Sequence, residues 1–144
     1  MTRVDFYVLA DNSHAARLEL ACKLAEKACG RAQKVFVYSK EQALLEDLDA
    51  RLWNFRPMSF IAHRLLPQSH LLNSEDDDPL LLSSNDPGSD RQILLNLDSG
   101  VPPFFSRFER TLEIVNKDTD VQAAGRKRYL FYKQRGYPLQ HHNL

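Results

Sequence analysis

The chain has 144 residues, of which 43% are hydrophobic and 26% charged, as expected of a single globular domain and not of a disordered or fibrous chain. Two cysteines are too few for a disulfide scaffold, and no apolar run approaches the roughly 20 residues that a membrane-spanning helix needs. The nineteen basic and nineteen acidic residues cancel, which argues against a protein that holds duplex DNA through many phosphate contacts, and we expect a soluble, reduced, cytoplasmic protein.

The first fifty residues alternate between strand and helix patterns. Residues 3–9 are rich in β-branched and aromatic types and predict a strand, as do residues 34–39. Apolar side chains recur every three or four positions in residues 14–29 and 40–53, which predicts two amphipathic helices, the first ended by Gly30. Strand, helix, strand, helix in this order is typical of a parallel βαβ sheet.

The rest of the chain continues the same architecture. Further strands are expected in residues 80–83, 92–97 and 111–115, and residues 59–66 predict a short strand followed by a loop. A short helix follows Pro102-Pro103, and a final helix covers about residues 120–135, ended by Gly136. We therefore predict a single α/β domain, 1–144, with a mostly parallel twisted sheet flanked by helices in a nucleotide-binding-like topology.

Two segments are expected outside this framework. Residues 67–79 are polar and acidic and predict a surface excursion, and residues 140–144 predict a flexible tail.

The usual signatures of catalysis and cofactor binding are missing from the sequence. The first strand-to-helix turn, LADNSHAA, has no glycine, whereas a phosphate loop needs glycines for close backbone approach to the pyrophosphate. Cys22 and Cys29 lie seven apart on an apolar helix stripe, a spacing typical of buried free thiols and not of a metal or redox pair. We expect no catalytic residue, no metal and no cofactor.

Charge is segregated along the chain despite the neutral sum. Residues 75–90 carry six acidic side chains and no Lys or Arg, whereas residues 121–144 carry five Lys or Arg and no acid. Such asymmetry favours an anionic partner for the basic end, although both runs are also compatible with simple solvation.

Large apolar side chains gather just after the second helix. They are Trp53, Phe55, Met58 and Phe60. One interpretation is a helix end that inserts its aromatic side chains into the core. The other is a hydrophobic patch that docks a partner, since Trp, Phe and Met are enriched at the centres of interfaces.

The last helix interleaves cations with tyrosines. The residues concerned are Arg126, Arg128, Tyr129, Tyr132 and Lys133. Such a strip can bind an anionic group and seat an aromatic one beside it, and Arg suits a carboxylate because its fork donates two parallel hydrogen bonds. A groove for single-stranded nucleic acid would use the same residue types, and a solvated helix face is the third interpretation.

Four segments resemble the chi subunit family of the bacterial DNA polymerase III holoenzyme. They are VDFYVLADN, the LW…RPMSFIAH stretch, QILLNL and, above all, the ending GRKRYLFYKQRGYPL. The resemblance implies a non-enzymatic, replisome-associated clamp-loader subunit whose nucleotide-binding-like fold binds no nucleotide. Such a subunit bridges the psi subunit to the acidic C-terminal tail of single-stranded DNA-binding protein, and so meets DNA only indirectly.

The resemblance also implies where these partners bind. The carboxylate and aspartates of the tail would meet Arg126 and Arg128, and its terminal phenylalanine would pack near Val115 and Tyr129. The full set of expected tail-binding residues is Val115, Arg126, Arg128, Tyr129, Tyr132, Lys133 and Gly136. The psi-facing surface would contain Trp53 and Phe60, and a DNA-repair helicase is a further candidate partner of that surface.

Two positions depart from the family pattern. Leu130 stands where relatives tend to carry a cation, so one contact with the tail is weakened or moved to Lys127 or Lys133. The acidic run 76–78 imitates the acidic tail, which leads to the hypothesis that this loop competes weakly for the basic helix.

Overall fold

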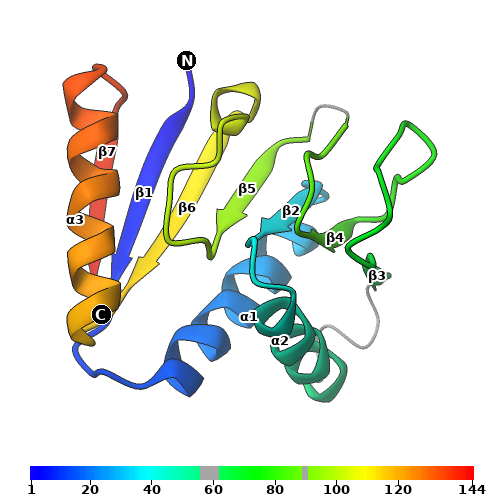
Figure 1. The fold of residues 1–144 in the computed structure, drawn as a ribbon, viewed down its shortest axis with the longest axis horizontal. Coiled ribbons are helices and arrows are strands. Elements are labelled where there is room, and N and C mark those ends of the chain that lie inside the picture. The colour runs from blue at the N-terminus through cyan, green and yellow to red at the C-terminus, as the bar shows by residue number, and fades with distance from the viewer. Residues whose placement is uncertain (56–61, 89–90) are drawn as a thin grey trace.

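The computed structural model describes residues 1–55, 62–88 and 91–144, which contain one seven-stranded parallel sheet (Figure 1). The strands are β1 (Arg3–Val8), β2 (Val35–Tyr38), β3 (His63–Leu65), β4 (Leu80–Ser83), β5 (Ile93–Asn96), β6 (Arg110–Val115) and β7 (Leu139–Asn143). Their order across the sheet is β3-β4-β2-β5-β6-β1-β7, and all pairings are parallel. The helices are α1 (His14–Gly30), α2 (Gln42–Asn54) and α3 (Thr119–Gln134), with a 3-10 turn η2 (Phe105–Arg107). The predicted single-domain α/β fold is confirmed.

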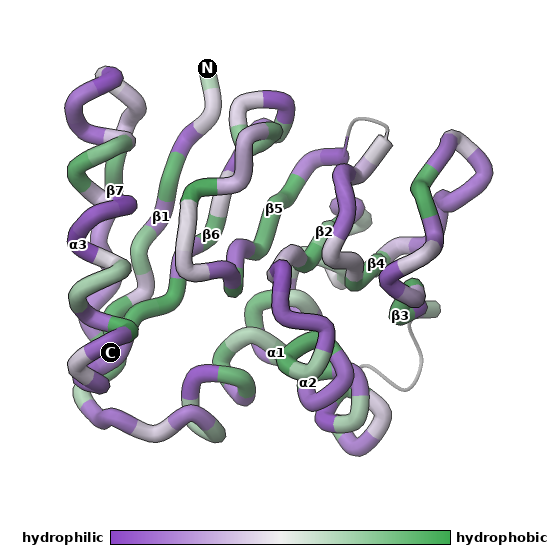
Figure 2. The backbone as a smooth tube through the Cα atoms, in the orientation of Figure 1, coloured by the Kyte–Doolittle hydropathy of each residue, from purple (hydrophilic) through white to green (hydrophobic). Residues whose placement is uncertain are grey.

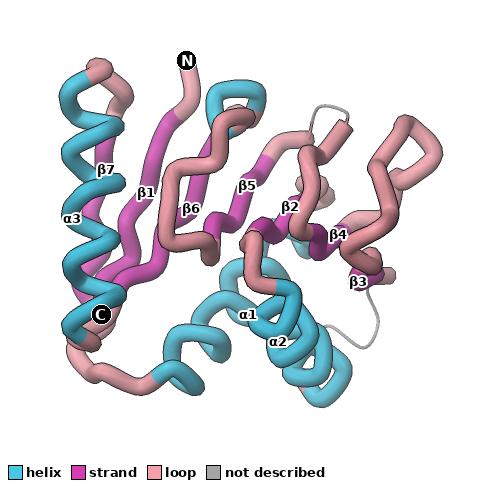
Figure 3. Tube along the Cα trace, viewed as in Figure 1, coloured by secondary structure: helices cyan, strands magenta, loops and turns pink. Residues whose placement is uncertain are grey.

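Alternate residues of each strand face two different cores. Val37 of β2 and Leu95 of β5 pack in the core beneath α1 and α2. Their neighbours Phe36 and Leu94 pack on the other face, against Tyr132 of α3 and the segment around η2. Figure 3 shows α1 and α2 beside each other and apart from α3. The central strands are apolar on both faces, as is usual for parallel sheets covered on both sides (Figure 2).

The ends of the helices follow from local side-chain chemistry. The Ser13 hydroxyl accepts a hydrogen bond from the Ala16 amide at the start of α1, and the Asp118 carboxylate accepts one from the Val121 amide at the start of α3. Gly136 ends α3 with φ +76°, as the sequence predicts. Gly30, by contrast, is still helical, and Ala32 adopts the left-handed conformation with φ +60°.

The expected flexible tail is a strand. β7 pairs with β1 in parallel register from Leu139 opposite Val4 to Asn143 opposite Val8, and the Leu144 amide donates to the Val8 carbonyl. The pairing supplies hydrogen-bond partners to the backbone groups at the edge of β1, which would otherwise lack them. The expectation of disorder for residues 140–144 is therefore corrected.

The acidic excursion is tied to its own end of the sheet. The Arg64 guanidinium donates to Asp76 and to Asp78, 2.9 Å each, and the Lys34 ammonium pairs with Asp77. Hydrogen bonds from His70, from the Asn73 amide and from Arg64 lower the pKa of Asp76 to about 2. β3, which carries Arg64, lies at the opposite end of the sheet from α3 (Figure 1). The hypothesis that residues 76–78 compete for the basic helix is therefore wrong, because local cations already pair with them.

In the ranges 1–55, 62–88 and 91–144, no helix has the length and apolar character required to cross a bilayer.

Candidate partner-binding surfaces

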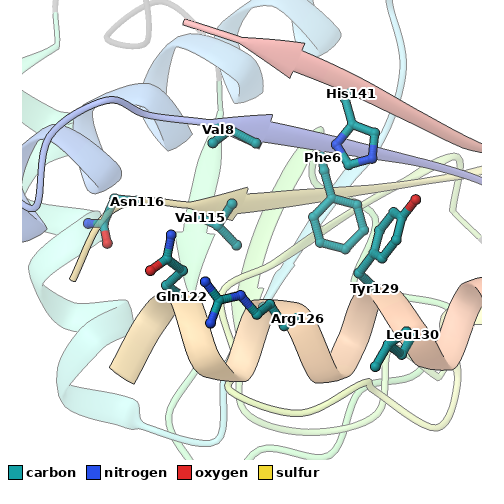
Figure 4. A pocket seen from close by; sticks show the side chains of 10 residues that line it. Phe6, Val8, Val115, Asn116, Gln122, Arg126, Tyr129, Leu130 and His141 are labelled. Carbon is teal, nitrogen blue, oxygen red and sulfur yellow. The ribbon is translucent and has the colours of Figure 1, made fainter. Parts of the chain in front are cut away.

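A pocket of about 380 Å³, which we call the α3 pocket, opens between the sheet and α3. Phe6 and Val8 of β1 and Val115 of β6 form its floor, and His141 of β7 forms one side (Figure 4). Its volume falls within the roughly 300–1,000 Å³ of typical ligand pockets. The α3 pocket is therefore large enough to receive a side chain from a partner.

A glycine sets the depth of the α3 pocket. A Cβ atom at Gly125 would lie 2.4 Å from the Val115 Cγ1 atom, a distance that real contacts do not reach. α3 can approach β6 this closely only because position 125 has no side chain. Gly125 was not singled out from the sequence, although it lies three residues after Gln122 and four before Tyr129, which is the spacing of one helix face.

Three rings from three different elements form an aromatic wall in the α3 pocket. The Phe6 and Tyr129 ring centres are 5.6 Å apart in an edge-to-face arrangement, and His141 lies 6.1 Å from Phe6 and 5.1 Å from Tyr129. Such rings offer favourable contacts to a further aromatic side chain. Phe6 and His141 were not predicted to belong to the site; His141 lies in the segment expected to be disordered.

Arg126 supplies the positive charge of the α3 pocket. Its side chain is exposed, points along the pocket toward Gln122 (Figure 4) and has no hydrogen-bond or ion-pair partner in the part of the chain that the structure describes. Leu130, 51% exposed, also lines the α3 pocket. The α3 pocket thus combines an aromatic wall with one available guanidinium, a pattern that suits a carboxylate beside an apolar group.

Arg128 and Tyr132 lie on another face of α3, in a buried network around Glu113. The Arg128 Nε donates to one carboxylate oxygen of Glu113 at 2.8 Å, and the Tyr132 hydroxyl donates to the other at 2.7 Å. Asn96 donates to the same carboxylate at 2.9 Å. Burial and the adjacent Glu113 raise the pKa of Tyr132, so its hydroxyl stays a donor. Arg128 and Tyr132, both expected to meet a bound tail, are at most 3% exposed and do not line the α3 pocket.

Some of the other expected tail-binding residues line the α3 pocket, and the rest lie outside it. Val115, Arg126 and Tyr129 line the α3 pocket together. The Lys133 ammonium lies 5.9 Å from the centre of the Tyr129 ring but outside the pocket lining, and Gly136 ends the helix beyond it.

The second surface, which we call the Trp53 surface, lies on α2. Trp53 is 61% exposed, and its ring centre is 4.3 Å from that of His63 on β3. A separate hollow of about 370 Å³ lies between α1 and α2 and is lined in part by Arg51 and Phe55, but not by Trp53. Met58 and Phe60 lie outside the described residues. The aromatic cluster is thus divided, since Phe55 packs against the core whereas Trp53 stays exposed.

The thiols and acids of the described ranges form no obvious metal centre. No group of three His, Cys, Asp or Glu side chains in these ranges is placed to hold a metal ion. Burial raises the pKa of both Cys22 and Cys29 to about 11, which disfavours the reactive thiolate.

Comparison with known proteins gives a consistent identification. The family model described as "DNA polymerase III chi subunit, HolC" matches residues 1–140. DNA polymerase III subunit chi of Pseudomonas aeruginosa is 39% identical over 145 residues, which cover 100% of this chain and 98% of that protein. The subunit of the same name from Haemophilus influenzae is 27% identical over 139 residues, covering 96% and 95%. The resemblance inferred from the four sequence segments is confirmed: the chain belongs to the DNA polymerase III chi subunit family.

Proposed function

We propose that this chain is a non-catalytic adaptor of the replicative polymerase complex, which holds the acidic C-terminal tail of single-stranded DNA-binding protein in the α3 pocket and the psi subunit on the Trp53 surface. Membership of the chi family implies a partner in the replisome. The identity of the two partners and the bridging role are the proposal.

The observation that carries the proposal is the unpaired Arg126 beside an aromatic wall. A C-terminal residue presents a carboxylate and a side chain a few ångströms apart, and the α3 pocket offers a matching guanidinium beside an apolar floor and an aromatic wall. The terminal carboxylate would accept two hydrogen bonds from Arg126 while a terminal phenyl ring packs between the floor and the aromatic wall. Further acidic residues of the tail would approach Lys127 or Lys133, both exposed on the same helix.

The alternative, direct binding of single-stranded nucleic acid, has less support in the geometry. A strand-binding groove needs several cations along one continuous track. Arg128 is buried with Glu113, and the Arg135 guanidinium lies 3.7 Å from the centre of the Phe131 ring. The basic residues of α3 therefore do not form a single strip in the described structure.

The test is fluorescence anisotropy with a labelled peptide that ends in an acidic run, Pro-Phe and a free carboxylate. We expect micromolar binding, loss of binding when the terminus is amidated, and no binding of a labelled poly-dT strand. Arg126→Ala should weaken the peptide by roughly tenfold or more, since a hydrogen bond to a charged group is worth about 1.5–3 kcal/mol.

Lys127→Ala is the matched control, because Lys127 is the exposed neighbour that does not line the α3 pocket. It should lower affinity only slightly and mainly at low salt. Equal losses in the two variants, or binding that ignores the amide, would contradict the assignment of the α3 pocket as the tail site.

A further inference from the structure

A second hollow, which we call the Arg17 hollow, lies at the carboxyl ends of the central strands and has a volume of about 220 Å³. It is lined by Ser39 after β2, by Asp98 and Ser99 after β5, and by Arg17 of α1 and Arg128 of α3. None of its lining residues belongs to the α3 pocket.

The position of the Arg17 hollow follows from the topology. From β2 the chain continues through α2 toward β3, whereas from β5 it continues in the opposite direction toward β6, so the order of the sheet reverses between β2 and β5. In open parallel sheets, ligands bind in the crevice at such a reversal, outside the carboxyl ends of the strands.

Arg17 is a buried cation without an acidic partner. It is 6% exposed, its Nε donates to the Ile114 carbonyl at 3.1 Å, and no carboxylate of the described ranges lies within ion-pair distance. Burial, followed by the nearby Arg128, lowers the pKa of Arg17, while Glu113 and Glu41 act in the opposite direction. Buried charges in proteins are usually paired, so an unpaired buried arginine calls for a counter-anion.

Arg128 adds an unused hydrogen-bond donor to the same hollow. It is 3% exposed, and its Nε and Nη1 donate to Glu113 and to the Ser99 carbonyl. Its buried Nη2 has no hydrogen-bond partner in the described part of the chain. A buried donor without a partner destabilises the fold, and a ligand oxygen would remove that penalty.

Glu113 pairs with Arg128, whereas no acidic side chain of the described ranges around the Arg17 hollow forms an ion pair with Arg17. The Asp98 carboxylate already accepts hydrogen bonds from the Lys40 and Gly100 amides, at 2.8 and 3.1 Å. Glu41 and Asp120 are exposed at the rim of the hollow. The buried interior therefore keeps an Arg17 guanidinium without an ion pair and an Arg128 Nη2 without a hydrogen-bond partner, as far as the described residues show.

We propose that the Arg17 hollow binds a small phosphate-bearing anion, held by the guanidinium groups of Arg17 and Arg128. Guanidinium forks match the oxygens of a phosphate group, and the hollow is smaller than the roughly 300–1,000 Å³ of drug-sized pockets. The turn after β1 lacks the glycines of a phosphate loop. Side-chain guanidinium groups, in place of backbone amides, would hold the anion.

The experiment is a titration of the isotope-labelled full chain, followed by NMR, with inorganic phosphate and separately with adenosine monophosphate at constant ionic strength. Sodium acetate serves as the control anion. We expect saturable shifts of backbone amides near Arg17, Ser99 and Arg128 with millimolar phosphate, and weaker shifts with acetate. Tighter binding of the nucleotide would identify a nucleotide phosphate as the source, and equal binding would identify free phosphate; both results support the proposal.

Arg17→Met is the test variant, with Lys23→Met, an exposed lysine of the same helix, as its matched control. Arg17→Met should weaken phosphate binding by roughly tenfold or more while the thermal midpoint without phosphate stays equal or rises, because an unpaired buried charge is removed. Lys23→Met should bind as the parent chain does. The proposal is overturned if phosphate causes no saturable shifts near the hollow, if shifts occur only around Arg126, or if Arg17→Met binds phosphate unchanged.

Discussion

In α3, residues two positions apart face in roughly opposite directions, because successive residues are about 100° apart around the helix axis. Arg126 lies exposed at the α3 pocket, whereas Arg128 is buried against Glu113. The sequence spacing distinguishes the buried face of α3 from the exposed one. The buried residues are Gly125, Arg128 and Tyr132, which lie at intervals of three and four. A residue-type pattern of cations and tyrosines does not separate the two faces, whereas the helical period does.

The burial of Arg128 leads to a prediction about stability. Arg128→Met should lower the free energy of unfolding by about 3–5 kcal/mol, because the buried Glu113 carboxylate would lose its ion-pair partner Arg128. Urea denaturation measures the loss. The double variant Arg128→Met/Glu113→Gln should recover part of it, since the amide needs no counter-charge.

Folded Arg128→Met should still bind the acidic tail peptide with an affinity close to that of the parent chain. A variant of normal stability that no longer binds the peptide would instead show that Arg128 belongs to the tail site.

At the scale of elements, most helices and strands could be predicted because each carries its own apolar period. β7 could not. Its residues LQHHN have no apolar alternation, and the strand exists because the edge of β1 offers backbone partners from Val4 to Val8. The pocket wall made by His141 was missed for the same reason, since a contact that depends on a neighbouring strand leaves no local signal.

A substitution in β7 can test whether His141 contacts the tail as part of the aromatic wall, apart from its place in the strand. His141→Ala should weaken binding of the tail peptide by roughly two- to tenfold, because an aromatic contact contributes about 0.5–1.5 kcal/mol. Gln140→Ala is the control, since its side chain is exposed and faces the other side of the strand. Anisotropy titrations and thermal midpoints should be measured together. Equal affinity in His141→Ala and the parent chain would remove β7 from the proposed site.

At the scale of the whole molecule, the sheet separates the two proposed docking surfaces. The Trp53 surface lies on α2, which packs against β3 and β4, and the α3 pocket lies over β6, β1 and β7 (Figure 1). These strands are at opposite ends of the order β3-β4-β2-β5-β6-β1-β7. No described residue of the α3 pocket also lines the hollow between α1 and α2, so these two hollows share no lining residue.

This separation predicts independent binding. Trp53→Ala should weaken association with the psi subunit by about 2 kcal/mol or more, as expected of an exposed aromatic anchor at an interface centre. It should leave the affinity for the tail peptide unchanged, and Arg126→Ala should do the reverse. In the double variant the two losses should add within about 0.5 kcal/mol, because distant sites without shared partners behave additively. Isothermal titration of each partner, alone and with the other bound, measures these terms.

If Trp53→Ala weakens both interactions together, Trp53 acts through the fold and not as a contact, since only a change in the shared scaffold would reach the α3 pocket from the far end of the sheet.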